Sequence, residues 1–118
     1  MAAKRNGEVR TMSCGSCSAI LTPEVREVVT QSAFVPLVTV SGDGKPHLIV
    51  VGKAREFRGD DTVVFGVYKM VTTGRNLAET GIMQAAAVAG KKGYRLSGRA
   101  RVEDQEVLFT VEQVDALL

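Results

Sequence analysis

Apolar and polar positions alternate in short stretches along most of this chain. From residue 33 onward, runs rich in valine, leucine, isoleucine and alanine are separated by segments that contain glycine, aspartate or lysine. This pattern is typical of antiparallel β-strands joined by tight turns. It predicts six strands, in AFVPLVTVS (33–41), PHLIVVGKA (46–54), TVVFGVY (62–68), IMQAAAVAG (82–90), YRLSGRARV (94–102) and QEVLFTVEQ (105–113).

A helix is expected before the first strand. The tripeptide TPE at 22–24 supplies a threonine N-cap, a proline for the first helical position and an acid for the first turn. Val25, Val28 and Val29 then form an apolar stripe at helical spacing. We expect this helix to end near Gln31.

The connections between the predicted strands carry their own signals. GDGK at 42–45 predicts a hairpin, and REFRGDDT at 55–62 predicts a second turn. Pro36 points to an edge strand or a bulge, because proline cannot donate a ladder hydrogen bond. The almost continuous apolarity of TVVFGVY at 62–68 predicts burial on both faces.

A short second helix is expected within MVTTGRNLAE at 70–79, around Asn76 and Leu77, with Gly81 as its terminator. VDALL at 114–118 is expected to form a final helical turn. Six closely spaced strands, one leading helix and one inserted helix together predict a mainly β protein, a small antiparallel barrel.

Length and composition place this barrel in one domain. A chain of 118 residues with 45% hydrophobic content is long enough for one core. We expect a flexible polar arm at 1–20 and the domain at 21–118. The 15 basic and 13 acidic residues are mixed, which argues against a nucleic-acid tail. With neither a secretory signal nor an apolar run of about 20 residues, a cytoplasmic protein without a membrane span is expected.

Few residues are suited to acid–base or metal chemistry. His47 is the only histidine, and the chain offers few partners for a metal site or a catalytic triad, so we interpret it as a half-buried strand residue. Cys14 and Cys17 form a C-x-x-C pair. The pair is redox-active, half of a metal site completed by a second copy, or incidental, and the sequence leaves these alternatives open.

A basic cluster spans a predicted turn and the strand after it. Its arginines occupy alternating strand positions and would share one face, either as a solvated face or as a grip for a ligand. The cluster consists of Lys91, Lys92, Arg95, Arg99 and Arg101.

The stretch at 70–79 gathers donors that suit an anion. Thr72, Thr73, Arg75 and Asn76 lie where a strand is expected to give way to a helix, and a helix N-terminus presents free backbone N–H groups. Such donors suit a dianionic phosphate. The alternative is that Thr72 only caps the helix.

In this order, the predicted elements resemble the FMN-binding split-barrel proteins, the pyridoxamine-5'-phosphate-oxidase-like family, and among them its small FMN-binding members. The resemblance covers residues 22–112. It rests on DGKPH at 43–47, on Thr73 placed three residues before the Asn76-Leu77 pair, and on LSGRA at 96–100. It implies a six-stranded antiparallel split β-barrel of Greek-key type that forms a homodimer and binds FMN in the groove between subunits.

The resemblance also implies which residues hold the cofactor. Thr73 and Asn76 match the phosphate motif, and Thr72, with Lys69 just upstream, stands where relatives often place a basic residue. A second-strand segment matches the one that runs beside the ribityl chain and the flavin ring. Because valine side chains cannot form hydrogen bonds, the valines of this segment would contact the flavin through their backbone. This segment consists of Val50, Val51, Gly52 and Lys53.

The implied function is that of a small flavoprotein in electron transfer, or an oxidoreductase of unknown substrate. Since FMN itself carries the redox chemistry, no catalytic acid or base is expected, and enzymatic activity stays an open question. The absence of tryptophan and of a C-terminal segment after Leu118 argues against a true pyridoxamine-phosphate oxidase. The alternative is a non-enzymatic barrel that binds haem, another nucleotide or, through the Arg95 to Arg101 face, single-stranded nucleic acid.

Overall fold

The computed structural model describes residues 20–66 and 70–118. The predicted arm at 1–20 therefore lies, apart from Ile20, outside the described residues, as do Cys14 and Cys17. The elements are α1 (Pro23–Gln31), β1 (Val35–Val40), β2 (Pro46–Val51), β3 (Glu56–Arg58), β4 (Thr62–Gly66), α2 (Val71–Glu79), β5 (Ile82–Ala89), β6 (Lys92–Glu103) and β7 (Glu106–Ala116).

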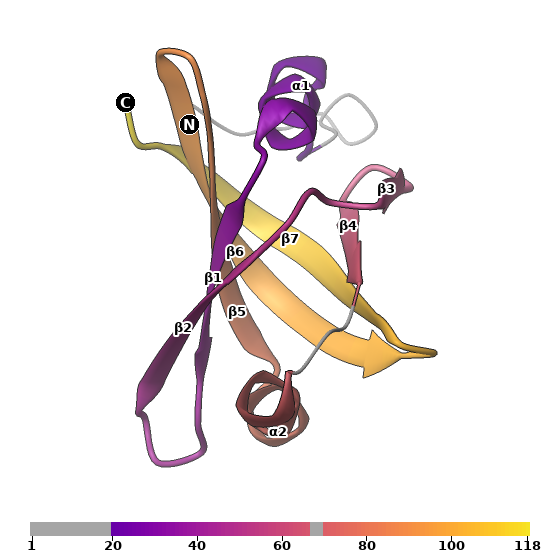
Figure 1. Cartoon of the computed structure of the whole chain (residues 1–118), viewed down its shortest axis with the longest axis vertical. Coiled ribbons are helices and arrows are strands. Elements are labelled where there is room, and N and C mark those ends of the chain that lie inside the picture. The colour runs from indigo at the N-terminus through magenta and orange to yellow at the C-terminus, as the bar shows by residue number, and fades with distance from the viewer. Residues whose placement is uncertain (1–19, 67–69) are drawn as a thin grey trace.

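All strands pair antiparallel in one sheet of seven strands, in the order β2-β1-β5-β6-β7-β4-β3. The sheet is strongly curved, with α1 near one end and α2 near the other (Figure 1). The prediction of a mainly β, antiparallel fold with two helices is confirmed. The prediction of a six-stranded barrel is wrong, because the sheet is open, with β2 and β3 at its edges.

The additional strand, β3, lies inside the stretch that was expected to be only a turn. Its three residues pair with β4, and Phe57 is half-buried opposite Val63. The Arg26 guanidinium of α1 lies 4.9 Å from the centre of the Phe57 ring. Because one aromatic residue between charged neighbours gives no alternating pattern, the sequence carries no signal for this strand.

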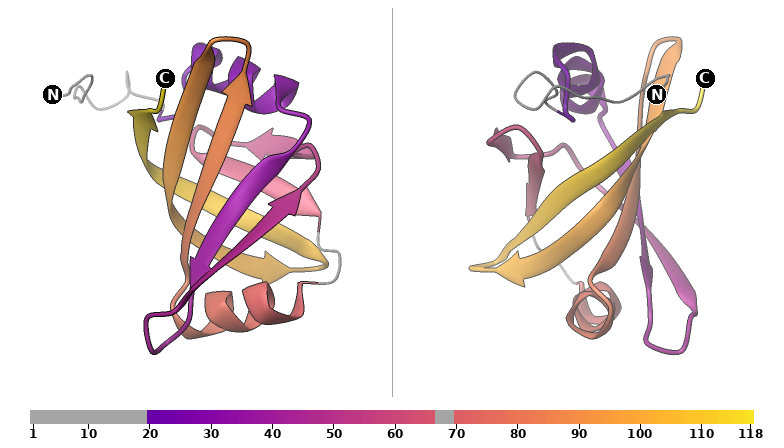
Figure 2. Two further views of the ribbon diagram at one scale, coloured as in Figure 1. Left: turned by 60° about the vertical axis from the view of Figure 1, so that its left-hand side comes forward. Right: turned by 180° about the vertical axis from the view of Figure 1, so that it is seen from behind.

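The core lies on one face of the sheet, here called the inner face. Val35 and Leu37 of β1, Met83 of β5 and Leu96 of β6 point into it, and all are at most 1% exposed. Both helices pack there, as Figure 2 shows from two sides. The opposite face of β2, β1, β5, β6 and β7 is called the outer face.

Helix α1 forms as its sequence predicts. Thr22 is the N-cap, with its hydroxyl oxygen accepting from the Val25 N–H at 3.3 Å, and Pro23 begins the helix. The apolar stripe is buried in the core. At the other end, Ser32 is buried, and its hydroxyl donates to the Val28 carbonyl and accepts from the Val88 N–H of β5. This serine therefore joins the end of α1 to the sheet.

The LSGRA stretch contains a β-bulge. The register of β6 against β7 shifts between Ser97 and Gly98. A Cβ placed on Gly98 would lie only 2.0 Å from the Thr110 carbonyl oxygen of β7, so only glycine allows the two backbones to approach this closely. Leu96 and Ala100 on either side are buried in the core.

Three further expectations need adjustment. The predicted final helical turn is wrong, because β7 extends to Ala116. Pro36 does not lie in an edge strand, since β1 is between β2 and β5, although pairing with β5 begins only at Leu37. Helix α2 starts at Val71, earlier than expected, and it ends before Gly81, whose φ of +71° favours glycine. Burial of Val63, Val64 and Phe65 on both faces of β4 is confirmed.

No helix in the described part of the chain is long and apolar enough to cross a membrane.

Candidate cofactor site

The N-terminus of α2 has no side-chain cap. Its N-cap residue is Met70, which makes no capping hydrogen bond, and no acidic residue stands in the first turn. The Gly74 N–H donates to the Met70 carbonyl at 2.8 Å, so the N–H groups before Gly74 are the ones a helix leaves without an intrahelical partner. Since Thr72 lies inside the helix, the alternative that it caps α2 is wrong. An uncapped helix N-terminus favours an anion.

Thr73 adds a second donor at this end of the helix. Its side chain is only 1% exposed, and its Oγ1 has no hydrogen-bond partner among the described residues. A buried hydroxyl without a partner is costly, so such an atom indicates a group that is completed by something else. Thr72 is half-buried and Arg75 is exposed on the same turns. The structure thus keeps all three residues on the first turns of α2.

Asn76, in contrast, already has a protein partner. Its Nδ2 donates to Thr39 Oγ1 on β1 at 3.0 Å, and both side chains are buried. This bond fixes α2 to the inner face of the sheet. Because the amide nitrogen carries two hydrogens and the amide oxygen accepts, Asn76 keeps one N–H donor and its oxygen for further polar contacts. Sequence reasoning did not identify Thr39, since a threonine within a strand is not distinctive.

The β2 segment lies apart from the first turns of α2. Val50 pairs with Pro36, three residues along β1 from Thr39, which corresponds to about 10 Å. Val50 is exposed on the outer face and Val51 is half-buried on the inner face, while Gly52 and Lys53 follow the strand and are exposed. β2 is an edge strand, so it has backbone groups that a ligand could reach. Lys69 lies outside the described residues.

His47 is half-buried on the inner face of β2, directly opposite Thr39. This agrees with its interpretation as a half-buried strand residue. The residues that the structure describes contain no cluster of three or more histidine, cysteine, aspartate or glutamate side chains able to hold a metal.

The arginines of β6 share the outer face, as predicted, and each has a partner. Arg95 pairs with Asp115 at 3.3 Å, and Arg101 pairs with Glu103 at 3.1 Å. Arg99 Nη1 donates to the Thr80 carbonyl at 3.3 Å. At the β5–β6 turn, Lys92 forms an ion pair with Glu24 of α1. These pairings favour the solvated-face interpretation of the basic cluster.

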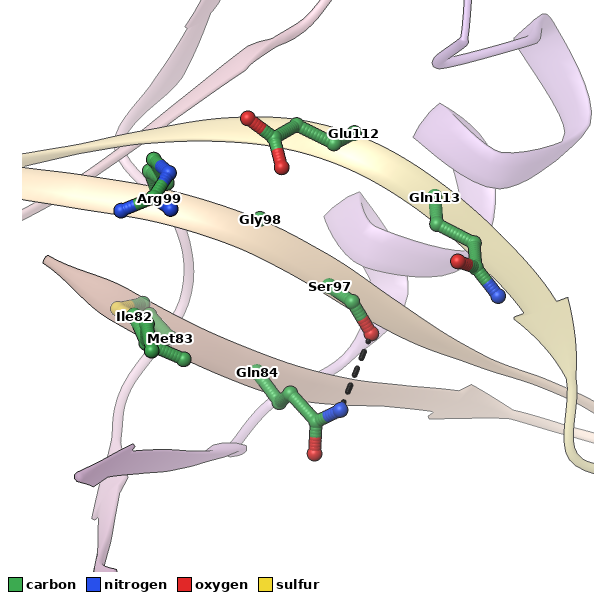
Figure 3. A pocket seen from close by; sticks show the side chains of 8 residues that line it. All are labelled: Ile82, Met83, Gln84, Ser97, Gly98, Arg99, Glu112 and Gln113. Carbon is green, nitrogen blue, oxygen red and sulfur yellow. Dashed lines mark hydrogen bonds between the residues drawn. The ribbon is translucent and has the colours of Figure 1, made fainter. Parts of the chain in front are cut away.

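An open pocket of about 260 Å³ lies on the outer face over the bulge (Figure 3). No pattern in the sequence indicates this pocket, because it depends on the register shift between β6 and β7. Its lining combines apolar, amide, hydroxyl and charged side chains, and the Gln84 amide donates to Ser97 Oγ at 3.2 Å. The lining residues are Ile82, Met83, Gln84, Ser97, Gly98, Arg99, Glu112 and Gln113.

The sequence matches the family description "Pyridoxamine 5'-phosphate oxidase" over residues 21–115, almost the whole described domain. The chain belongs to this family. The predicted resemblance is thereby confirmed. No curated protein sequence matches the chain.

Several solved structures share this fold. HupZ from Group A Streptococcus superposes with a TM-score of 0.70 at 19% identity, covering 81% of this chain and 93% of HupZ. An FMN-binding protein from Syntrophomonas wolfei gives 0.63 at 16% identity, with 79% and 88% covered. HutZ, the haem storage protein from Vibrio cholerae, gives 0.57 at 14% identity, with 81% and 94% covered. At these identities the similarity shows the fold.

Proposed function

We propose that this chain is a small flavoprotein that binds FMN as a homodimer, in electron transfer or as an oxidoreductase. The observation that carries the proposal is the uncapped N-terminus of α2, together with the buried hydroxyl of Thr73, which has no hydrogen-bond partner in the described part of the chain. Family membership and the similarity to an FMN-binding protein support it. FMN would supply the hydride or electron chemistry, and the protein would bind and orient it.

The FMN phosphate would be held by the first turns of α2. Its charge suits the free N–H groups and the helix dipole, and the Thr73 hydroxyl and Arg75 guanidinium are donors on the same turns. Asn76 would contribute through its second amide hydrogen while it holds α2 against Thr39. Lys69 and Thr72 are further phosphate donors in this proposal. The segment from Val50 to Lys53 would run beside the ribityl chain and ring through its backbone.

The test replaces Thr73 with valine, which has nearly the same shape but no hydroxyl. Because a hydrogen bond to a charged group contributes about 1.5 to 3 kcal/mol, Thr73→Val should weaken FMN binding about tenfold to hundredfold. Riboflavin lacks the phosphate, so its affinity should change little. Flavin absorbance and fluorescence titrations measure both constants. Equal losses for both flavins, or a wild-type protein that takes up no FMN, would contradict the proposal.

Haem is the second candidate ligand, favoured by the similarity to HutZ and by a single half-buried histidine on the open edge strand. A neutral imidazole is a common axial ligand of haem iron. If haem is the ligand, titration should give a Soret band that His47→Ala shifts or abolishes. An unchanged spectrum in His47→Ala would remove this histidine as the ligand.

A further inference from the structure

The outer face of β2, β1 and β5 is apolar although no described helix covers it. Leu48 and Val50 of β2 are 63% and 58% exposed, and Ile82 and Val88 of β5 are 43% and 48% exposed. Val38 of β1 lies between them, opposite Leu48 on one side and Gln84 on the other. A sheet face that meets water normally carries polar residues, and contiguous apolar patches mark interaction sites.

A flank of mixed charge adjoins this apolar patch on β6 and β7. It carries three arginines and four acids on the outer face. One of the acids, Glu106, pairs with Arg55 and Arg58, and two further ion pairs within the chain use four of the other charges. Those pairs are Arg95 with Asp115 and Arg101 with Glu103. A flank that is balanced in this way is poorly suited to nucleic acid, which requires one sign of charge.

The remaining two charges are Arg99 and Glu112. Both line the pocket over the bulge, which Ile82 of the apolar patch also borders (Figure 3). Within residues 20–66 and 70–118, no ion pair joins the two side chains, although they belong to neighbouring strands. The Arg99 guanidinium keeps its hydrogen bond to the Thr80 carbonyl, but within those residues neither it nor the Glu112 carboxylate forms an ion pair. Both charges face the same opening, where a charge of an external partner could reach them.

We infer that this outer face docks a second copy of the chain around a twofold axis. The apolar patches of the two copies would lie against each other, and Arg99 of each copy would pair with Glu112 of the other. Twofold symmetry makes every contact between two different residues occur twice. A surface with one charge of each sign that forms no ion pair among the described residues therefore complements itself. The inference rests on the homodimer in the proposed function and names the surface that forms it.

Charge reversal tests the paired contacts. In sedimentation equilibrium of the full chain, Arg99→Glu and Glu112→Arg should each raise the dimer dissociation constant at least tenfold, because like charges then face each other across the axis. The double variant Arg99→Glu/Glu112→Arg should return it to within about threefold of the wild-type value. Lys91→Glu, in the exposed β5–β6 turn, changes net charge equally and should have no effect. A double variant as weak as the single variants would overturn the pairing.

A second comparison tests the apolar patch. Leu48→Lys should give a monomer at concentrations where wild type is a dimer, whereas Val102→Lys should not, since Val102 is 44% exposed but lies on the inner face. Circular dichroism checks that each variant is folded. Leu48→Lys and Val102→Lys chains that dimerise equally would overturn the surface assignment.

Two outcomes separate this inference from the proposed cofactor. A wild-type chain that binds FMN while sedimenting as a monomer overturns the docking surface and leaves the cofactor in place. A wild-type dimer that behaves as predicted but binds no FMN supports the surface and overturns the cofactor.

Discussion

At the residue scale, the hydrogen bond between Asn76 and Thr39 connects the candidate phosphate site to the sheet. Both side chains are buried, at 3% and 1% exposed, and an amide buried without a partner would be costly. Asn76 therefore has a structural role besides any contact to a ligand. Its substitution alone cannot identify the phosphate site, which is why the isosteric change at Thr73 is the sharper test.

The bond can be measured in the protein without ligand. Asn76→Ala should lower the free energy of unfolding by about 1 to 3 kcal/mol, because it leaves Thr39 unpaired in a buried position. Thr39→Val should also destabilise, and urea unfolding of the double variant should show that the two losses are not additive. Additive losses would mean that the 3.0 Å contact contributes no coupling.

Two glycines should respond oppositely to alanine. Gly98→Ala should destabilise by more than about 2 kcal/mol or prevent folding, since its Cβ would lie 2.0 Å from the Thr110 oxygen. Gly74→Ala should stabilise by about 0.5 to 1 kcal/mol, because Gly74 is within α2 and has open space where a Cβ would stand. Melting temperatures of the two variants provide the measurement. A tolerated Gly98→Ala would show that β7 can move away from the bulge.

At the element scale, Ser32 shows how α1 is attached to the sheet. Its hydroxyl accepts from the Val88 N–H of β5 at 3.0 Å and donates to the Val28 carbonyl at 2.7 Å. One small side chain thus closes the end of the helix and satisfies a strand N–H group 56 residues away.

Removing this hydroxyl should weaken the attachment of α1 to β5. Ser32→Ala should lower stability by about 1 to 3 kcal/mol, since the Val88 N–H would lose its partner in a partly buried position. Thr30→Ala, at an exposed position two residues earlier, serves as the control and should change stability little. Hydrogen exchange should also show faster exchange at Val88 in Ser32→Ala. Exchange as slow as in wild type would contradict the attachment.

Elements with regular patterns could be predicted from the sequence. The capped helix α1 and the alternating strands β5 and β6 were found because local propensity and burial agree there. β3 was missed because this strand forms through its pairing with β4 and the contact of Phe57 with Arg26, which no local sequence pattern shows. The end of β7 was assigned to a helical turn because its pairing with β6 is a long-range contact that no local pattern records.

The candidate site was predictable only in part, for the same reason. The donors of α2 are consecutive in sequence, so the motif could be recognised. That Thr73 is buried and Asn76 bonds to Thr39 depends on how α2 packs on the sheet. The pocket depends on a bulge, and the two charged residues in its lining, Arg99 and Glu112, come from separate strands.

At the scale of the whole molecule, a surface cluster joins α1 to β6. Glu24 accepts hydrogen bonds from Lys92 and from the Tyr94 hydroxyl, and these hold the pKa of Glu24 below its usual range. The same contact with Glu24 raises the pKa of Lys92. Because the cluster is exposed, its contribution to stability is small and decreases with salt.

The sign of the pH effect follows from the lowered pKa of Glu24. A carboxyl whose pKa is lower in the folded protein contributes its stability above its ordinary value of 4.5, and this contribution is lost as pH falls through the folded pKa. Wild type should therefore melt above Glu24→Gln at pH 7, and the difference should shrink as pH falls below 4.5. Thermal melts across this range at low salt give the comparison. A difference that persists in acid would mean that the effect is not electrostatic.

The sheet order has a consequence for synthesis on the ribosome. β1 finds its second neighbour only when β5 has been made, and β4, whose three central residues are buried, pairs with the last strand, β7. The hairpin of β1 and β2 can form early, but the apolar residues of β4 have only β3 beside them until β7 emerges. Folding is thus delayed until nearly the whole chain is available, and the nascent chain exposes the apolar residues of β4 from the time this strand emerges until β7 follows.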